Sequence, residues 1–64
     1  MKTIEFDYEQ GRLVVDDEPL HCGDCVTVLY DGAPVSIRIE MNIKDQWYSP
    51  QLPGIRLEGL EVLQ

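Results

Sequence analysis

Apolar and polar residues alternate along most of this chain, and the clearest alternation lies on either side of Asp31-Gly32. A period of two residues is typical of a β-strand with one buried and one solvated face. A two-residue type I′ turn needs positive φ at both central positions, and an Asp-Gly pair adopts it readily. We therefore predict an antiparallel hairpin in which residues 25–30 pair with a returning strand that starts near Pro34. Val26, Val28 and Tyr30 share one face of the first strand, and the returning strand has its own apolar face of Val35, Ile37, Ile39 and Met41.

The other segments show shorter runs of the same period, and no stretch has a helical pattern of useful length. Asp16-Asp17-Glu18-Pro19 is expected to end a strand as a solvated turn, because proline cannot donate to a β-ladder. The prolines in 50–54 exclude regular structure there, and 20–24 and 42–45 are expected to be loops. Strands are predicted over residues 3–9, 13–15, 25–30, 35–41, 46–49 and 55–58, with a bend at Gly59.

Five to six short strands in a chain of 64 residues have little apolar surface to bury. They hide their apolar faces only by curling over themselves, which also reduces the exposed sheet edge. A two-sheet sandwich needs about 100 residues. The sequence therefore predicts one all-β domain over residues 1–64, a small, partly open SH3-like barrel of antiparallel strands.

The formal charge is −7, with twelve acidic residues against five basic ones. A surface this acidic repels nucleic acid and anionic membranes, so neither is an expected partner. This negative charge is typical of a soluble protein, and it also favours binding to a basic protein partner. No apolar run approaches the roughly 18 residues of a membrane-spanning helix, and no signal peptide is recognised. Together with two cysteines this predicts a reducing, cytoplasmic location.

The segment His21-Cys22-Gly23-Asp24-Cys25 contains a Cys-x-x-Cys motif beside the single histidine, a combination found in redox and metal sites. A redox pair needs its first thiol at a helix N-terminus, and here a strand-like run follows instead. A structural zinc site needs four ligands, whereas His21, Cys22 and Cys25 supply at most three. The favoured interpretation is a tight turn, in which Gly23 gives backbone freedom and Asp24 bonds back to nearby amides.

No arrangement of catalytic residues stands out, and no cofactor is expected. His21 and Cys22 are adjacent, and adjacent residues rarely reach the hydrogen-bond geometry that a Cys–His pair needs. The glycines are too scattered for a phosphate loop. Binding residues are more plausible among the aromatics. Trp47 and Tyr48 are consecutive and point to opposite faces of a strand, Tyr30 flanks the hairpin turn, and Arg38 lies on the polar face of the returning strand. These four residues are our candidates for contacts with a partner.

Several short motifs together resemble a small uncharacterised family of Gram-positive bacteria, a domain of unknown function with an SH3-like barrel. The resemblance spans roughly residues 20–62 and implies no activity, cofactor or catalytic residue. The family pattern has no second cysteine at the position of Cys25, which weighs against a Cys-x-x-Cys site. The motifs are Leu20-His21-Cys22-Gly23-Asp24, Arg38-Ile39-Glu40-Met41, Trp47-Tyr48, Pro53-Gly54 and Leu57-Glu58-Gly59-Leu60-Glu61-Val62.

The function expected from these patterns is a non-enzymatic interaction module. It binds a basic protein or an extended peptide through Tyr30, an outward ring of Trp47 or Tyr48, and an acidic rim. Two alternatives stay open at this point. One is a zinc- or redox-linked site at His21, Cys22 and Cys25. The other is a structural subunit of a homodimer, since small domains often gain stability by pairing.

Overall fold

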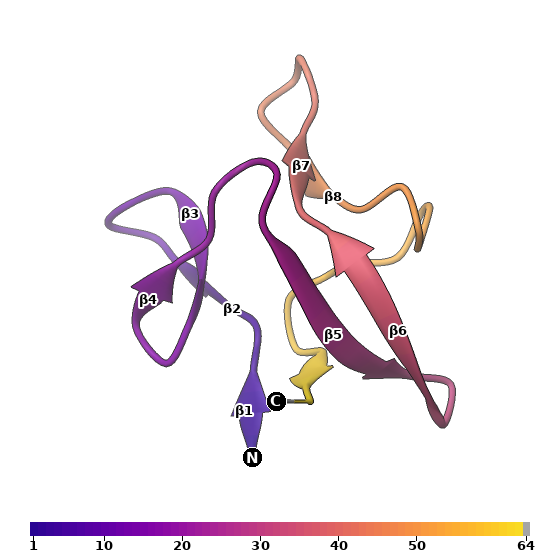
Figure 1. The fold of residues 1–64 in the computed structure, drawn as a ribbon. Coiled ribbons are helices and arrows are strands. Elements are labelled where there is room, and N and C mark those ends of the chain that lie inside the picture. Colours follow the sequence, from indigo (N-terminus) through magenta and orange to yellow (C-terminus); the bar gives the residue numbers. More distant parts are fainter. Residues whose placement is uncertain (64) are drawn as a thin grey trace.

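Nine short strands make up the computed structural model, which describes residues 1–63, and they form three antiparallel sheets (Figure 1). The four-stranded sheet has the order β1 (Lys2–Thr3), β9 (Glu61–Val62), β5 (Cys25–Tyr30) and β6 (Ala33–Arg38). The three-stranded sheet has the order β2 (Glu5–Asp7), β3 (Arg12–Val15) and β4 (Glu18–Pro19). The two-stranded sheet pairs β7 (Glu40–Met41) with β8 (Trp47–Tyr48). The all-β prediction is confirmed, and the sheets over residues 1–63 do not join into a closed barrel.

The β5–β6 hairpin is the longest ladder, and the structure confirms its prediction. Tyr30 pairs with Ala33 around a two-residue turn, in which φ is 53° at Asp31 and 78° at Gly32. The register places Val26 opposite Ile37, so the apolar residues of both strands share one face. Val28 and Ile37 are fully buried as a result.

The predicted strand over 35–41 is interrupted at Ile39, which separates β6 from β7. The N–H of Ile39 donates to the carbonyl of Asp24, and its own carbonyl accepts from the N–H of Gly23, each over 2.8 Å. The chain thus leaves the four-stranded sheet at this residue and enters the two-stranded sheet. Ile39 is fully buried at the corner.

Ile4 forms a second corner of the same kind and divides the predicted strand over 3–9 into β1 and β2. Its N–H donates to the carbonyl of Leu60 (2.9 Å), and its carbonyl accepts from the N–H of Gly59 (2.7 Å). Ile4 is also fully buried. Each corner divides one predicted strand into two, because the period of two continues through the corner while the ladder partner changes.

Two further predictions were wrong. Glu18–Pro19 was expected only to break a strand, but it pairs with Val14 and Val15 as the edge strand β4. Proline is tolerated there because an edge strand has one unpaired side. Residues 55–58 were expected to be the last strand, but they lie outside regular structure and β9 follows them. Turns lie at both ends of this segment: the N–H of Ile55 donates to the carbonyl of Leu52, and the N–H of Leu60 donates to the carbonyl of Leu57, each over 3.2 Å.

One cluster of buried apolar residues takes members from the four-stranded and three-stranded sheets and from the segments between strands. Partly buried rings and aliphatic side chains, including Phe6, Tyr30 and Trp47, pack against it. No helix within residues 1–63 is long and apolar enough to cross a membrane. The buried members are Ile4, Leu13, Leu20, Val28, Ile37, Ile39, Leu52, Leu57 and Val62.

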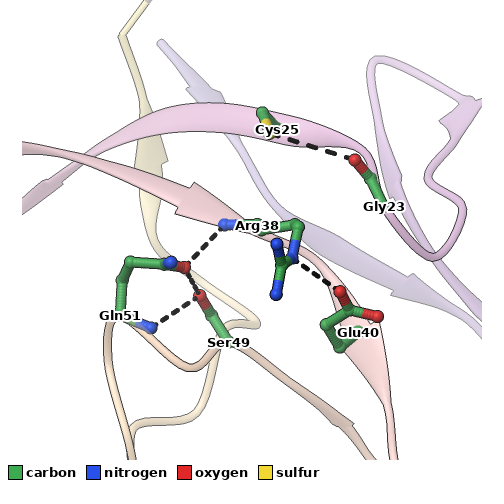
Figure 2. A network of polar contacts seen from close by, with 6 residues as sticks. All are labelled: Gly23, Cys25, Arg38, Glu40, Ser49 and Gln51. Carbon is green, nitrogen blue, oxygen red and sulfur yellow. Dashed lines mark hydrogen bonds and ion pairs between the residues drawn. The ribbon is translucent and has the colours of Figure 1, made fainter.

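The outer edge of β6 is protected by a side chain rather than by another strand (Figure 2). In a hairpin closed at Tyr30 and Ala33, alternate residues of β6 direct their backbone groups outward, namely Pro34, Ser36 and Arg38. Pro34 has no N–H to offer, and the N–H of Arg38 donates to Oε1 of Gln51 (2.9 Å). Only Ser36 keeps an outward N–H on this edge among the described residues, so strand addition by another chain is disfavoured.

Candidate functional site

A surface pocket of about 250 Å³ lies where β2, β3 and β8 meet the segment before β9. Phe6 and Leu13 come from the three-stranded sheet, Trp47 comes from β8, and Leu57 precedes the last strand. These four apolar side chains are half of the eight lining residues. The remaining lining residues are polar or charged: Asp45, Gln46, Arg56 and Glu58.

Trp47 is held in place by contacts with the β2–β3 connection and the start of β3. Its indole Nε1–H donates to the carbonyl of Gly11 (3.3 Å). The guanidinium carbon of Arg12 lies 5.6 Å from the centre of a Trp47 ring, a cation–π distance. Arg12 is itself fixed, because its Nη1 donates to the carbonyl of Leu20 (2.9 Å). The indole therefore has a defined orientation, in which it is half-buried and lines the pocket.

The turn after β2 fixes the neighbouring aromatic pair. The side chain of Gln10 donates to Asp7 Oδ2 (2.8 Å), and the backbone N–H groups of Gln10 and Glu9 donate to Oδ1 (3.3 and 2.9 Å). These bonds, led by the Gln10 side chain, hold the pKa of Asp7 below its ordinary value of 3.8. Tyr8 is left 82% exposed, and its ring meets Phe6 edge to face at 4.8 Å.

The charged groups at the pocket are exposed and unequal in number. Asp45 and Glu58 are two carboxylates against the one guanidinium of Arg56, so the lining carries a net charge of −1. Within residues 1–63 none of these three takes part in an ion pair; the pairs found join Lys2 to Asp16, His21 to Asp24 and Arg38 to Glu40. The side chains at the pocket are thus available to a ligand.

The surrounding surface is more strongly acidic than the lining. Residues 5–19, which form the three-stranded sheet and its turns, hold six acidic residues and one basic residue, so their net charge is −5. That is most of the formal charge of −7. This sheet supplies Phe6 and Leu13 to the pocket, so the pocket opens beside the most negative part of the molecule.

Of the four residues predicted to bind a partner, Trp47 is the one that lines the pocket. Arg38 and Tyr48 both lie beside Glu40: Arg38 Nε is 2.6 Å from Glu40 Oε2, and Tyr48 pairs with Glu40 in the β7–β8 ladder. Tyr30 is half-buried against the core at the far end of β5. Tyr30 lies five residue steps along β5 from Cys25, the residue opposite Arg38, which is a distance of roughly 17 Å. The structure therefore does not gather the four into one site.

The His21–Cys25 string forms a turn, as the favoured interpretation predicted. Asp24 Oδ2 accepts the backbone N–H of His21 (2.8 Å), and Gly23 has a φ of 93°. Cys22 and Cys25 are exposed and free of any disulfide, and the Cys25 thiol lies 3.9 Å from the Gly23 carbonyl (Figure 2). Residues 1–63 contain no group of three or more His, Cys, Asp or Glu side chains placed to hold a metal ion.

Sequence reasoning missed most of the pocket. Phe6 and Leu57 were assigned to two separate predicted strands, 3–9 and 55–58. Their meeting with Trp47 joins residues up to 51 positions apart, from Phe6 to Leu57. One available signal for the pocket was the single tryptophan, Trp47, which the sequence patterns had already selected, with Tyr48, as a candidate for contacts with a partner.

Comparison with known proteins agrees with the resemblance seen in the sequence motifs. A search of curated proteins gives no match. The crystal structure of a structural-genomics target protein from the Gram-positive bacterium Ruminococcus gnavus is similar over nearly the whole fold. Its TM-score is 0.82 at 36% sequence identity, with 98% of this chain and 97% of that chain covered. The model of the domain of unknown function DUF5348 matches residues 2–63, and the chain therefore belongs to the DUF5348 family.

Proposed function

We propose that this domain is a small non-enzymatic interaction module that binds a basic, extended segment of a partner protein at the Trp47 pocket. The observation that carries the proposal is the pocket itself, with an apolar lining that includes two aromatic rings and with unpaired carboxylates at Asp45 and Glu58. Aromatic-lined grooves are a common means of binding extended segments. Interaction sites also favour tryptophan, because a large ring gives much contact area for little loss of side-chain entropy.

Charge complementarity selects a basic partner. The three-stranded sheet beside the pocket has a net charge of −5, which attracts a Lys- or Arg-rich segment and raises its association rate. The same field repels nucleic acid, anionic membranes and a second copy of this acidic chain. The exposed free thiols of Cys22 and Cys25 suit a reducing compartment, and we propose the cytoplasm.

The arrangement of the sheets fits this function. We propose that the three sheets around one core are an opened SH3-like barrel, a fold in which loops beside aromatic residues receive extended peptides. Peptide addition along the edge of β6 is disfavoured by Pro34 and by the bond from Arg38 N–H to Gln51. The pocket is then the more accessible place for a segment to bind.

Trp47 is the single tryptophan of the chain, so its fluorescence reports directly on the pocket. We would titrate the protein with short extended peptides rich in Lys and Arg, and with control peptides in which Glu replaces each basic residue. The proposal predicts a saturable change in Trp47 fluorescence with the basic peptides, which weakens near 1 M salt, where the Debye length is about 3 Å. No saturable change up to about 1 mM peptide, or equal binding of the acidic controls, would contradict it.

Two variants separate pocket binding from unspecific attraction. Trp47→Ala, measured by anisotropy of a labelled basic peptide, is expected to lose binding. Ile43→Ser is the matched control, because Ile43 is 99% exposed on the β7–β8 turn and does not line the pocket. Circular dichroism of each variant checks that the strands remain formed. Equal affinity of Trp47→Ala and the unchanged protein would place binding elsewhere.

A further inference from the structure

We infer that the pocket receives one Lys or Arg side chain of the bound segment, with its aliphatic stem against the apolar lining and its charged end at Asp45 and Glu58. This inference rests on the proposed function and names the residue that the site selects. It combines three observations: the size of the pocket, its aromatic and aliphatic lining, and the balance of charge around it.

The size of the pocket indicates a single side chain. Its volume of about 250 Å³ falls below the range of about 300–1,000 Å³ that is usual for sites of small molecules and cofactors. The pocket is also open at the protein surface, so a side chain can enter while its backbone stays outside. An extended segment would therefore place one residue in the pocket and run across the neighbouring sheet.

The lining suits a side chain that is apolar along its length and charged at its end. Phe6, Leu13, Trp47 and Leu57 offer apolar surface to three or four methylene groups. Lys and Arg bury such stems while the charged group stays near water. A cation close to the face of Trp or Phe also gains a cation–π contribution. Arg12 already uses this attraction, since its guanidinium carbon is 5.6 Å from a ring centre of Trp47.

The charges at the pocket favour a cation over an uncharged apolar residue or an anion. Among the lining residues, the carboxylates of Asp45 and Glu58 oppose the single guanidinium of Arg56, and no ion pair within residues 1–63 involves any of them. The guanidinium of Arg12 at the Trp47 ring is not part of the lining and donates to the carbonyl of Leu20. A bound ammonium or guanidinium group would neutralise the excess carboxylate. Arg56 acts against this binding, so its removal is expected to strengthen the interaction.

The test compares three peptides that differ at one position. A basic parent peptide with one central Lys is compared with the same peptide carrying norleucine or Ala there, while the flanking basic residues stay constant. Norleucine keeps the stem of Lys and removes only its charge. We expect the Lys peptide to bind about five- to tenfold more tightly than the norleucine peptide, from the cation–π and carboxylate attractions together. The Ala peptide should bind more weakly than both.

Protein variants locate the effect. Glu58→Gln and Asp45→Asn should each weaken binding of the Lys peptide about twofold to fivefold and leave the norleucine peptide almost unchanged. Arg56→Gln should strengthen binding of the Lys peptide. Glu18→Gln is the matched control, because it removes the same unit of charge from β4, outside the pocket lining. It should affect both peptides equally and slightly.

The possible outcomes distinguish this inference from the proposed function. Equal or tighter binding of the norleucine peptide at Trp47 overturns the inference of a cation in the pocket and leaves the interaction module standing. An effect of Glu18→Gln as large and as selective as that of Glu58→Gln also overturns it. Failure of the parent peptide to bind at all overturns both proposals.

Discussion

Ile39 and Asp24 are joined by a backbone hydrogen bond of 2.8 Å from the N–H of Ile39 to the carbonyl of Asp24. The carbonyl of Ile39 in turn accepts from the N–H of Gly23. At this residue the chain is therefore bonded to the loop before β5 and not to a neighbouring strand. Ile4 makes the same two bonds with Gly59 and Leu60. In each pair of bonds a glycine with a φ near 93° donates to the isoleucine carbonyl, and the residue after the glycine accepts from the isoleucine N–H.

This relationship gives a structural role to three of the short motifs seen in the sequence. The His-Cys-Gly-Asp motif bonds to the Arg-Ile-Glu motif through Ile39, and the Leu-Glu-Gly-Leu motif bonds to Ile4. Each contact lets the chain turn from one sheet into another while the N–H and the carbonyl of the buried isoleucine stay bonded. The His21–Cys25 segment thus has a structural role, which is to bond the backbone of Ile39 where the chain changes sheets.

Substitution of either corner glycine should destabilise the domain. Gly23 and Gly59 have φ values of 93° and 94°, which side chains of L-residues rarely adopt, although no atom lies within 4 Å of an added Cβ. Gly23→Ala and Gly59→Ala are each expected to lower the free energy of unfolding by about 1 kcal/mol or more, through backbone strain alone. Urea unfolding measures the change. Gly32→Asn is the comparison, because asparagine tolerates the turn and should cost less.

The side chain of Ile39 should contribute strongly to stability, because it is fully buried at its corner. Ile39→Val is expected to cost about 1 kcal/mol, and Ile39→Ala about 2–5 kcal/mol, enough to unfold much of so small a protein. Ile43→Ala, at a position 99% exposed, should change the unfolding free energy by less than about 0.5 kcal/mol. Chemical denaturation of the three variants checks the order, and a stable Ile39→Ala protein would contradict the assigned packing.

Removal of the Gln51 side chain should expose the edge of β6. Oε1 of Gln51 accepts from the N–H of Arg38 and from the hydroxyl of Ser49, each over 2.9 Å, and Ser49 is fully buried (Figure 2). Gln51→Ala is expected to cost about 1–3 kcal/mol, because these donors lose their acceptor. Gln51→Glu retains an acceptor oxygen and should cost less. Hydrogen exchange at the Arg38 amide should be faster in Gln51→Ala, and unchanged exchange would show that this bond does not protect the edge.

The turn at Asp7 should make stability depend on pH in the acid range. The folded protein lowers the pKa of Asp7 below 3.8, mainly through the side chain of Gln10, so the ionised carboxylate favours the folded state. This contribution is present above pH 3.8 and is lost as the pH falls through the lower, folded pKa. Asp7→Asn keeps an acceptor oxygen without the charge and should show a weaker loss of stability between pH 5 and pH 2. Thermal unfolding of both proteins across this pH range measures the effect. Identical dependence of the unfolding temperature on pH in the two proteins would refute it.

The two cysteines should be dispensable for folding. Both are exposed and free, and residues 1–63 hold no group of three metal-ligating side chains. The double variant Cys22→Ser, Cys25→Ser should therefore unfold within about 0.5 kcal/mol of the unchanged protein. Addition of EDTA should leave the circular dichroism spectrum unchanged, and the purified protein should contain zinc far below one equivalent. A chelator-induced loss of strand signal would instead revive the zinc alternative.

The sequence by itself determined the local structure wherever neighbouring residues decide it. The alternation around Asp31-Gly32 predicted the β5–β6 hairpin and its buried face, because side-chain period and turn chemistry act over a few residues. The turn at Gly23-Asp24 and the irregular segment 50–54 follow for the same reason. The net charge, and with it the class of partner we propose, also depends on composition alone.

Only the tertiary structure decided where strands change sheets and what forms the pocket. The corners at Ile4 and Ile39 depend on bonds to Leu60 and Asp24, residues distant in the chain, and alternation continues unchanged through them. The pocket unites Phe6, Trp47 and Leu57, which each satisfy their local pattern as ordinary apolar residues. A period of two specifies which face of a strand is buried, but the partner that covers that face is selected by the packing of the whole chain.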